Sequence, residues 1–336
     1  MSSIQKVVLV TGGAGFLGRH VCKRLLEQGR TFVICLDNLV TGKWSNVEEF
    51  INSPNYSPYF HFVHYDITVR IKMENILPGL FDHIDEIYHL ACIASPDKYK
   101  EYAIETLMTS FQGTKNVLDL AKQFSRGDRS CKVLFTSTSE IYGDPLVHPQ
   151  SEDYYGNVNT VGERSCYDEG KRVAETLIYE YRRKYGLDVK TVRLFNTYGP
   201  YMDIDDGRVI TNFIKQIMAN KPVHIYGDGS QSRSFCYVDD LMDGLFAMMA
   251  SDEQGPINLG NPYCEFTLNQ LVYVFEKVVG AHIPVHYLPG TENDPKQRKP
   301  DITKAYETLG FSPMIDLEDG LRRLIAYFRN ERAQTK

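Results

Sequence analysis

The stretch KVVLVTGGAGFLGRHV, residues 6–21, decides the fold of this 336-residue chain. Its opening run, Lys6–Val10, is apolar and rich in valine, which predicts a buried strand. Gly12, Gly15 and Gly18 follow, and then a segment with helical periodicity. Glycines at a strand–turn–helix junction let the backbone approach a pyrophosphate, and the helix N-terminus supplies N–H donors. The stretch therefore predicts a dinucleotide site; a glycine-rich turn without a ligand is the alternative.

Residues beside these glycines are expected to touch the cofactor as well. Phe16 and Leu17 lie between the last two glycines, and a second apolar run ends in Asp37 and Asn38. A carboxylate at the end of the second strand accepts hydrogen bonds from the adenosine ribose hydroxyls and repels a 2′-phosphate. The sequence therefore predicts NAD rather than NADP.

The first half of the chain alternates apolar runs with amphipathic segments. Six runs are predicted to be strands: Lys6–Val10, Phe32–Leu36, Phe60–Val63, Glu86–Leu90, Val133–Ser137 and Val189–Leu194. Three segments are predicted to be helices: His20–Gln28, Tyr102–Phe124 and Tyr167–Lys184. Continuous apolar strands separated by helices indicate a parallel sheet covered on both faces. Right-handed crossovers then give a doubly wound, Rossmann-like α/β fold.

Beyond Pro200 the pattern loosens, and the helices Val209–Ala219 and Asn269–Val279 alternate with short strands. We interpret residues 1–199 as an NAD-binding domain. Residues 200–336 are expected to form mainly a smaller, mixed α/β substrate-binding domain at the carboxyl edge of the sheet. Residues 237–262, which include the segment Tyr237–Met249, are expected to return to the first domain.

Composition excludes several classes of protein. The net charge of −6 is spread along the chain without a basic block, so no nucleic-acid partner is expected. The seven cysteines include no C-x-x-C pair and predict neither a disulfide framework nor a metal site. The first strand begins within a few residues of Met1, which leaves no room for a signal peptide. No apolar run approaches the ~20 residues of a membrane span. We expect a cytoplasmic protein without membrane contact.

A tyrosine–lysine pair supplies the candidate chemistry. SCYDEGKRVAET, residues 165–176, puts Tyr167 and Lys171 one helical turn apart, so their side chains point the same way. A phenol with a pKa near ~10 is a poor base, but an ammonium and a positive nicotinamide ring lower that pKa. We expect Tyr167 to take a proton from a substrate hydroxyl and Lys171 to hold the nicotinamide ribose. Thr138 is expected to donate opposite the phenol; a surface cation–aromatic pair is the alternative.

Gly170, between that tyrosine and lysine, is unfavourable in a helix interior by about 1 kcal/mol. It predicts a close approach of this helix to the cofactor or to another helix.

The G-x-x-G-x-x-G spacing and the Tyr-x-x-x-Lys pair resemble the short-chain dehydrogenase/reductase superfamily. The resemblance implies that Asp66 and Ile67 flank the adenine, although Asp66 could merely cap a strand end. It also implies that Leu90 and Ala91 line the nicotinamide side of the site.

Later stretches supply candidates for binding a nucleoside diphosphate. In GRVITNFI, Arg208 and Val209 stand at a helix entrance, where backbone N–H groups can meet a diphosphate or uracil. HIYGDGSQSRSF adds Tyr226, suited to stacking on a base, and Arg233, suited to phosphate. Core packing is an equal alternative for Tyr226. RLFNTYGP resembles the extended, nucleotide-sugar branch of the superfamily, in which the asparagine, here Asn196, contacts the substrate diphosphate.

Longer motifs narrow the resemblance from the nucleotide-sugar branch to a single family. The chain contains STSEIYGDPLVHPQSEDYYGNVN, CYDEGKRVAET, FNTYGP, DGRVITNF, NLGNP and DPKQRKPDITKA. Together they resemble the UDP-glucuronate decarboxylase (UDP-xylose synthase) family, most densely from Phe135 to Asp301. C4-epimerases of this branch usually carry a small residue or Thr at position 140, and 4,6-dehydratases carry an Asp-Glu pair. Ser139-Glu140 matches the decarboxylases, with a solvated loop position as the alternative for Glu140.

This resemblance implies a mechanism. Tyr167 deprotonates the 4-hydroxyl of UDP-glucuronate, hydride passes to NAD, and the resulting UDP-4-keto intermediate loses CO₂. Thr138 and Tyr167 donate to the enolate oxygen, and Glu140 or a water that it orients protonates C5. Return of hydride gives UDP-xylose and regenerates NAD. Arg298 is expected to grip either the carboxylate or the diphosphate; a surface salt bridge is the alternative.

Three departures stand out: Cys92-Ile93 replaces the Ser-Pro of that family, Ser110 replaces an asparagine typical of the superfamily, and Tyr201 replaces an arginine of the decarboxylases. A UDP-sugar C4-epimerase, or a decarboxylase that releases the UDP-4-keto-pentose, therefore stays open. A non-catalytic NAD-sensing protein is the alternative outside enzymes. By analogy with relatives, helices Tyr102–Phe124 and Tyr167–Lys184 are expected to form a homodimer interface.

Overall fold

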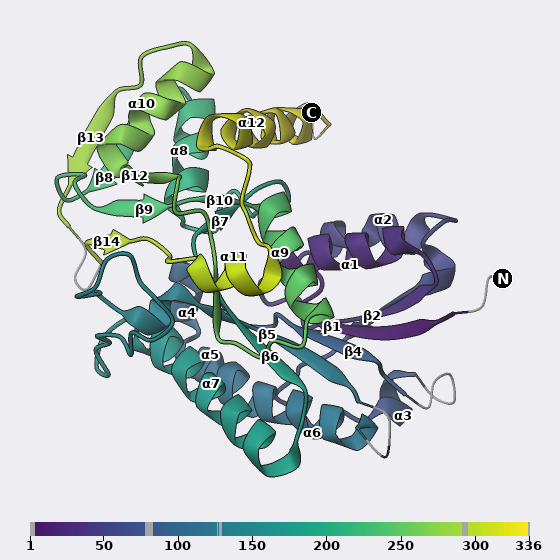
Figure 1. Cartoon of the computed structure of the whole chain (residues 1–336). Coiled ribbons are helices and arrows are strands. Elements are labelled where there is room, and N and C mark those ends of the chain that lie inside the picture. Colours follow the sequence, from purple (N-terminus) through teal and green to yellow (C-terminus); the bar gives the residue numbers. More distant parts are fainter. Residues whose placement is uncertain (1–3, 78–82, 126, 128–129, 291–294, 335–336) are drawn as a thin grey trace.

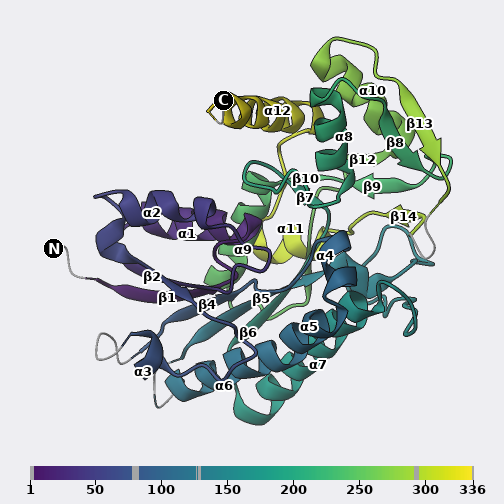
Figure 2. The same ribbon diagram turned by 180° about the vertical axis from the view of Figure 1, so that it is seen from behind.

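A seven-stranded parallel sheet organises the first half of the chain (Figures 1 and 2). The computed structural model describes residues 4–77, 83–125, 127, 130–290 and 295–334. The strand order is β11-β6-β5-β4-β1-β2-β3. These strands are β1 (Lys6–Thr11), β2 (Thr31–Asp37), β3 (Phe60–His64), β4 (Glu86–His89), β5 (Lys132–Thr138), β6 (Val189–Leu194) and β11 (Ile257–Leu259). The predicted doubly wound fold and its six predicted strands are confirmed.

Both faces of the sheet are buried, as the apolar runs predicted. Val8 and Val10 of β1 pack into one core cluster, whereas Val7 and Leu9 pack into another. This follows from the two-residue alternation of a strand. Helices α1 (Phe16–Gln28), α2 (Glu48–Asn52) and α9 (Val238–Ala250) lie on the first face. Helices α5 (Ala103–Met108), α6 (Thr114–Phe124) and α7 (Ser165–Tyr185) lie on the opposite one (Figures 1 and 2).

Helix α1 begins four residues earlier than predicted. Gly15 occupies its N-cap with an extended backbone, so Phe16 is already helical and Gly18 lies inside the first turn. A Cβ on Gly18 would collide with the carbonyl oxygen of Gly12. The glycine loop and the helix start are therefore one continuous, closely packed unit. Helix α1 ends at Gly29, as predicted.

The long predicted helix Tyr102–Phe124 is interrupted. α5 and α6 are joined by a π-helical turn, η3 (Thr109–Gly113), which packs against α7. A Cβ on Gly170 of α7 would lie 3.0 Å from Ser110 Oγ and 3.1 Å from Ser110 Cβ. The close approach predicted at Gly170 is therefore made to another helix.

Short elements surround the sheet in the first half. They are η1 (Trp44–Asn46), η2 (Ser57–Tyr59), α3 (Met73–Ile76), α4 (Pro96–Glu101) and η4 (Ser139–Tyr142). Helix α4 was not predicted, and Tyr102, with ψ of 52°, separates it from α5. None of the helices in the described ranges has the length and apolar character needed to cross a bilayer.

The remaining elements build a second layer above the carboxyl edge of the sheet. Small sheets β10-β7, β12-β9-β14 and β13-β8 form there. Their strands are β7 (Thr197–Tyr198), β8 (Val223–Tyr226), β9 (Ser232–Ser234), β10 (Cys236–Tyr237), β12 (Glu265–Thr267), β13 (Val285–Leu288) and β14 (Gln297–Arg298). The helices are α8 (Val209–Met218), α10 (Leu268–Val279), α11 (Thr303–Leu309) and α12 (Leu317–Gln334). α9 packs on β5 and β6, and β11 pairs with β6. The domain boundary at 199/200 stays a prediction.

Replacing Gly170 by leucine is expected to lower the free energy of unfolding by about 1–3 kcal/mol, because a branched side chain cannot fit against Ser110. Urea unfolding followed by circular dichroism measures this. Thr176→Leu, at an exposed position of the same helix, is the control and is expected to stay within ~0.5 kcal/mol of wild type. Equal stability of Gly170→Leu and wild type would contradict the close packing.

Candidate active site

One cavity of about 1310 Å³ lies between the carboxyl edge of the large sheet and the second layer. It is lined by every residue that the sequence singled out for cofactor, chemistry or substrate. The loop and adenine-side residues are Gly12, Gly15, Phe16, Leu17, Gly18, Asp37, Asn38, Asp66 and Ile67. The central residues are Leu90, Ala91, Thr138, Ser139, Glu140, Tyr167 and Lys171. Those from the second layer are Asn196, Arg208, Val209, Tyr226, Arg233 and Arg298. The structure thus brings the whole predicted set together, and their individual roles stay predictions.

The glycine loop is shaped for close contact. Gly12 has a φ of +73°, and a Cβ there would lie 2.8 Å from the backbone of Ala91. Gly15 donates its N–H to Gly12 O at 3.1 Å and borders the cavity at the start of α1. The 13-residue helix α1 presents the N–H groups of its first turn at this place. This cradle suits the pyrophosphate of a dinucleotide.

Asp37 at the end of β2 is fixed by backbone donors. Its carboxylate accepts N–H bonds from Ala14 at 3.0 Å and Leu39 at 2.8 Å. Burial raises the pKa of Asp37 above its ordinary value, and these two hydrogen bonds oppose the rise. The carboxylate thereby ties the glycine loop to the second strand, where ribose hydroxyls are expected.

The adenine side lies next to Asp37. The Asn38 amide donates to Asp66 at 3.3 Å, and Asp66 accepts from the backbone and hydroxyl of Thr68 at 2.8 Å. Ile67 is buried against Gly113 of the π-helical turn. Asp66 therefore caps a turn and also borders the cavity. A capping role and a place beside the adenine are compatible.

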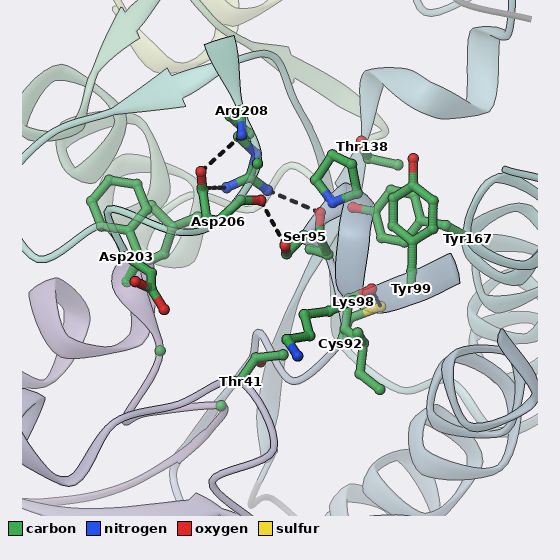
Figure 3. A pocket seen from close by; sticks show the side chains of 18 of the residues that line it. Thr41, Cys92, Ser95, Lys98, Tyr99, Thr138, Tyr167, Asp203, Asp206 and Arg208 are labelled. Atoms are coloured by element: carbon green, nitrogen blue, oxygen red, sulfur yellow. Dashed lines mark hydrogen bonds and ion pairs between the residues drawn. The ribbon is translucent and has the colours of Figure 1, made fainter. Parts of the chain in front are cut away.

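The catalytic candidates meet at the centre of the cavity. The Thr138 hydroxyl hydrogen-bonds to Tyr167, and Figure 3 shows the two side chains next to each other. Lys171 donates from Nζ to the carbonyl of Thr136 at 2.8 Å and lies 4.8 Å from the ring centroid of Phe135. All three side chains are nearly excluded from solvent.

The protein's own groups raise the pKa of Tyr167. Burial is the main cause and the nearby Cys92 thiol adds to it, whereas the hydrogen bond from Thr138 opposes the rise. The predicted lowering of this pKa by Lys171 together with a positive nicotinamide ring stays a prediction, because burial raises the pKa of Tyr167 in the protein without that ring. The ring is held in place by Tyr99, which stacks on it at 5.2 Å between centroids (Figure 3).

Two of the departures from the family pattern lie together beside this tyrosine. Cys92 Sγ is 3.6 Å from Ser110 Oγ, and Cys92 lines the cavity. Tyr201, the third departure, has a φ of +68° and covers the guanidinium of Arg19 at 3.7 Å. Cys92 and Ser110 therefore form one local change, on the side of the cavity that is predicted to hold the nicotinamide.

Glu140 is the centre of a buried ion cluster. It follows Ser139 in η4, directly after β5, and Thr138 Oγ1 accepts its backbone N–H at 3.2 Å. Arg298 of β14 binds its carboxylate through both terminal nitrogens, and Arg164 donates to it at 2.5 Å. These two guanidinium groups hold the pKa of Glu140 well below its ordinary value against the effect of burial.

This geometry limits the roles that were predicted for Glu140 and Arg298. An ionised carboxylate between two guanidinium groups is a poor proton donor, so direct protonation of C5 by Glu140 does not fit. Orientation of a water fits better, because an ionised carboxylate accepts hydrogen bonds. Arg298 donates two hydrogen bonds to Glu140. Because this residue is only 3 % exposed, the alternative of a surface salt bridge is excluded.

The second layer supplies the substrate candidates. Arg208 is fixed by Asp206 at 2.9 Å and by the carbonyl of Ala94 at 3.1 Å (Figure 3). Val209 is the first residue of α8, so its backbone N–H lies at a helix entrance. Arg233 and Arg298 are register partners in β9 and β14, and Arg233 is largely buried.

Tyr226 and Asn196 border the same end of the cavity. Tyr226 is half exposed, which excludes the core-packing alternative and leaves its ring accessible. Asn196 receives a backbone bond from Cys236 at 2.8 Å, and its side chain borders the cavity. Asp294, the first residue of DPKQRKPDITKA, lies outside the described residues.

Sequence reasoning missed several members of the site. Arg164, Asp206 and Tyr99 line the cavity, and Asp168 lies behind it on α7. Arg164 and Asp168 flank Tyr167 in sequence, one turn before it and directly after it. Their charges within a buried helix were an available signal, since charged residues are rarely buried without a partner.

The comparisons with known proteins agree on one family. A family model described as "NAD dependent epimerase/dehydratase family" matches residues 8–260. The chain is 46% identical over 322 residues to UDP-glucuronic acid decarboxylase 5 of Arabidopsis thaliana, covering 96% of this chain and 89% of that protein. It is 44% identical over 327 residues to UDP-glucuronic acid decarboxylase 1 of Xenopus tropicalis, covering 97% and 73%.

Solved structures give the same fold. A crystal structure of UDP-glucuronic acid 4-epimerase from Bacillus cereus, in complex with UDP-glucuronic acid and NAD, superposes with a TM-score of 0.83. It is 28% identical and the match covers 97% of this chain and 99% of that one. The overall architecture is therefore shared with proteins of more than one activity.

Glu140→Ala is expected to lower the free energy of unfolding by about 3–5 kcal/mol, because it leaves the buried Arg298 without its counter-ion. Glu140→Gln keeps acceptor capacity and is expected to cost less, about 1–3 kcal/mol. Urea unfolding at pH 7 measures both. Glu101→Ala, which breaks an exposed pair with Lys98, is the control, with a change below ~1 kcal/mol. A loss for Glu140→Ala no larger than this control would refute the structural role of the cluster.

Proposed function

Because the chain belongs to the NAD-dependent epimerase/dehydratase family, we propose that it decarboxylates UDP-glucuronate to UDP-xylose, with NAD recycled in each turnover. The observation that carries the proposal is the Glu140–Arg298 pair beside Thr138 and Tyr167. Ser139-Glu140 is the decarboxylase pattern, in a chain 43–47% identical to proteins named UDP-glucuronic acid decarboxylase.

The residues present fit NAD. The Gly12–Gly15 cradle and the start of α1 would hold the pyrophosphate, and Asp37 would accept the ribose hydroxyls. Lys171 would hold the nicotinamide ribose, and its ammonium donates to the carbonyl of Thr136 near the carboxyl end of β5. When bound, NAD accepts hydride from the sugar and later returns it.

Tyr167 takes the proton of the 4-hydroxyl in this proposal. Its buried ring is held by Tyr99, and its oxygen is held by Thr138, so the phenol is preorganised toward one position. The protein alone raises the pKa of Tyr167, and a positive charge arriving in the cavity would lower it. The base is thus activated only in the loaded enzyme.

The C4 ketone of the oxidised sugar stands β to the C6 carboxylate, so loss of CO₂ delivers its electron pair into that carbonyl. Thr138 and the neutral Tyr167 are placed to donate to the developing oxygen anion. The ionised Glu140 then orients a water toward C5 for protonation. Arg298 and Arg164 fix the position of Glu140.

Arg208, Val209, Asn196, Arg233 and Tyr226 form the nucleotide end in this proposal. Arg208 is oriented by Asp206 before any ligand arrives, which reduces the entropy lost on binding a diphosphate. Tyr226 offers an exposed ring face for the base.

We also propose a homodimer built on the outer faces of α5, η3 and α7. Outside the cavity lining, these neighbouring elements expose large apolar side chains: Leu107, Phe111, Val173 and Tyr179. A contiguous apolar face on adjacent helices favours burial against a second copy. A cytoplasmic location is proposed as well, because the seven cysteines are free thiols, which persist in a reducing compartment.

Purified protein incubated with UDP-glucuronate and NAD is expected to give a product lighter by one CO₂, read by mass spectrometry. An isobaric product would indicate a C4-epimerase instead. A product lighter by CO₂ and by two further hydrogens, with NADH accumulating, would indicate release of the UDP-4-keto-pentose.

Tyr167→Phe is expected to lower kcat by at least ~10³-fold while UDP binding changes little, because only the proton acceptor is removed. Steady-state turnover and calorimetric titration with UDP measure the two effects. Tyr185→Phe, at the end of the same helix, is the matched control with unchanged turnover. Wild-type turnover in Tyr167→Phe would exclude this residue as the base.

Analytical ultracentrifugation is expected to find a dimer that Phe111→Glu with Tyr179→Glu converts to monomer, because buried charges oppose association. Met314→Glu, at an exposed apolar residue before α12, is the control and should stay dimeric. A monomeric wild type, or a dimer that survives the double substitution, contradicts this interface.

A further inference from the structure

Asp168 is a buried carboxyl group that the proposed mechanism does not use. It follows Tyr167 on α7, is 7 % exposed, and its Oδ1 has no hydrogen-bond partner among the described residues. Burial of a carboxylate without a partner is costly. The neighbouring charged groups therefore decide whether Asp168 is ionised.

Charged groups from several elements face Asp168. Glu140 of η4 repels its ionised form, while Arg164 at the start of α7 and Arg298 of β14 attract it. Glu169 on its own helix repels it as well. Tyr99 of α4 and Cys166 of α7 also interact with it, and the Tyr99 hydroxyl has no partner within the described ranges.

The charge of this cluster depends on Asp168. Arg164 and Arg298 carry two positive charges, and the ionised Glu140 carries one negative charge. Burial and Glu140 raise the pKa of Asp168 to about 7, and the two arginines do not offset the rise. The cluster is therefore net positive when Asp168 is protonated and neutral when it is ionised.

We propose that Asp168 is a positioning residue that takes up a proton when the carboxylate of an acidic sugar nucleotide binds at Arg298. This rests on the proposed function and adds how the site selects a uronate over a neutral sugar. Arg298 lines the cavity, and its Nε–H is a buried donor without a partner among the described residues. A second anion at this guanidinium satisfies that donor.

Binding of the uronate and protonation of Asp168 are thermodynamically linked. A uronate carboxylate next to Glu140 and an ionised Asp168 makes three anions for two cations, whereas protonation of Asp168 restores neutrality. Binding the uronate therefore raises the proton affinity of Asp168, and by reciprocity protonation strengthens uronate binding. Affinity for the acidic sugar is retained below about pH 7 and falls as the pH rises above it. A neutral sugar nucleotide shows no such fall.

Two unreactive probes test this on the NAD-loaded wild-type enzyme: UDP-4-deoxy-4-fluoroglucuronate and UDP-4-deoxy-4-fluoroglucose. Neither has the 4-hydroxyl, and they differ only at C6. Calorimetry in buffers of different ionisation enthalpy counts the protons taken up. At pH 8 we expect uptake approaching one proton with the acidic probe and none beyond background with the neutral one. The Kd of the acidic probe should rise by up to ~10-fold per pH unit above neutrality.

Asp168→Asn is expected to abolish the extra proton uptake and to flatten the pH dependence of Kd. Glu169→Gln removes the same charge one residue away and should keep both. Uptake that persists in Asp168→Asn, or that is equal for the two probes, overturns the proposal. If Asp168→Asn does not fold, the two probes on wild type still decide. Failure of the mass assay would instead refute decarboxylation itself.

Discussion

The ion cluster around Glu140 joins three distant parts of the chain. Glu140 follows the fifth strand, Arg164 precedes helix α7, and Arg298 comes from the short strand β14 in the second layer. Such a cluster is stable only when every charge is paired, because unpaired charges are expensive away from water. The position of the second layer over the sheet therefore depends on this contact. The two layers also share one hydrophobic core, and the cavity lies beside the ion cluster.

The rest of the site follows from the parallel sheet. Asp37 and Thr138 are the last residues of their strands, and the glycine loop and Ala91 follow the carboxyl ends of theirs. Parallel strands place these ends along one edge, so residues far apart in sequence converge without long loops. Tyr167 and Lys171 reach the same edge from α7, which packs against η4 and η3. One architectural rule thus positions both the cofactor cradle and the proton acceptor.

Much of this could be predicted from the sequence. The six strands, the glycine loop and the Tyr167–Lys171 spacing depend on local patterns, which the sequence displays directly. The π-helical turn at Thr109–Gly113 could not be predicted, because it depends on packing between Ser110 and Gly170. The role of Arg164 could not be predicted, because its partner Glu140 lies 24 residues away in the sequence. The effect of burial on the pKa of Tyr167 could not be predicted for a related reason: burial depends on tertiary structure, whereas the neighbouring lysine is visible in the sequence.

Helix α7 presents Tyr167 and Lys171 on its inner side and Val173 and Tyr179 on its outer side. At Gly170, where α7 has no side chain, Ser110 of the neighbouring π-helical turn packs closely against its backbone. A rigid rod of this kind cannot shift on one side alone. A small displacement at the outward surface would therefore reorient the phenol, and natural variation far from the sugar could tune reactivity without altering any group that contacts it.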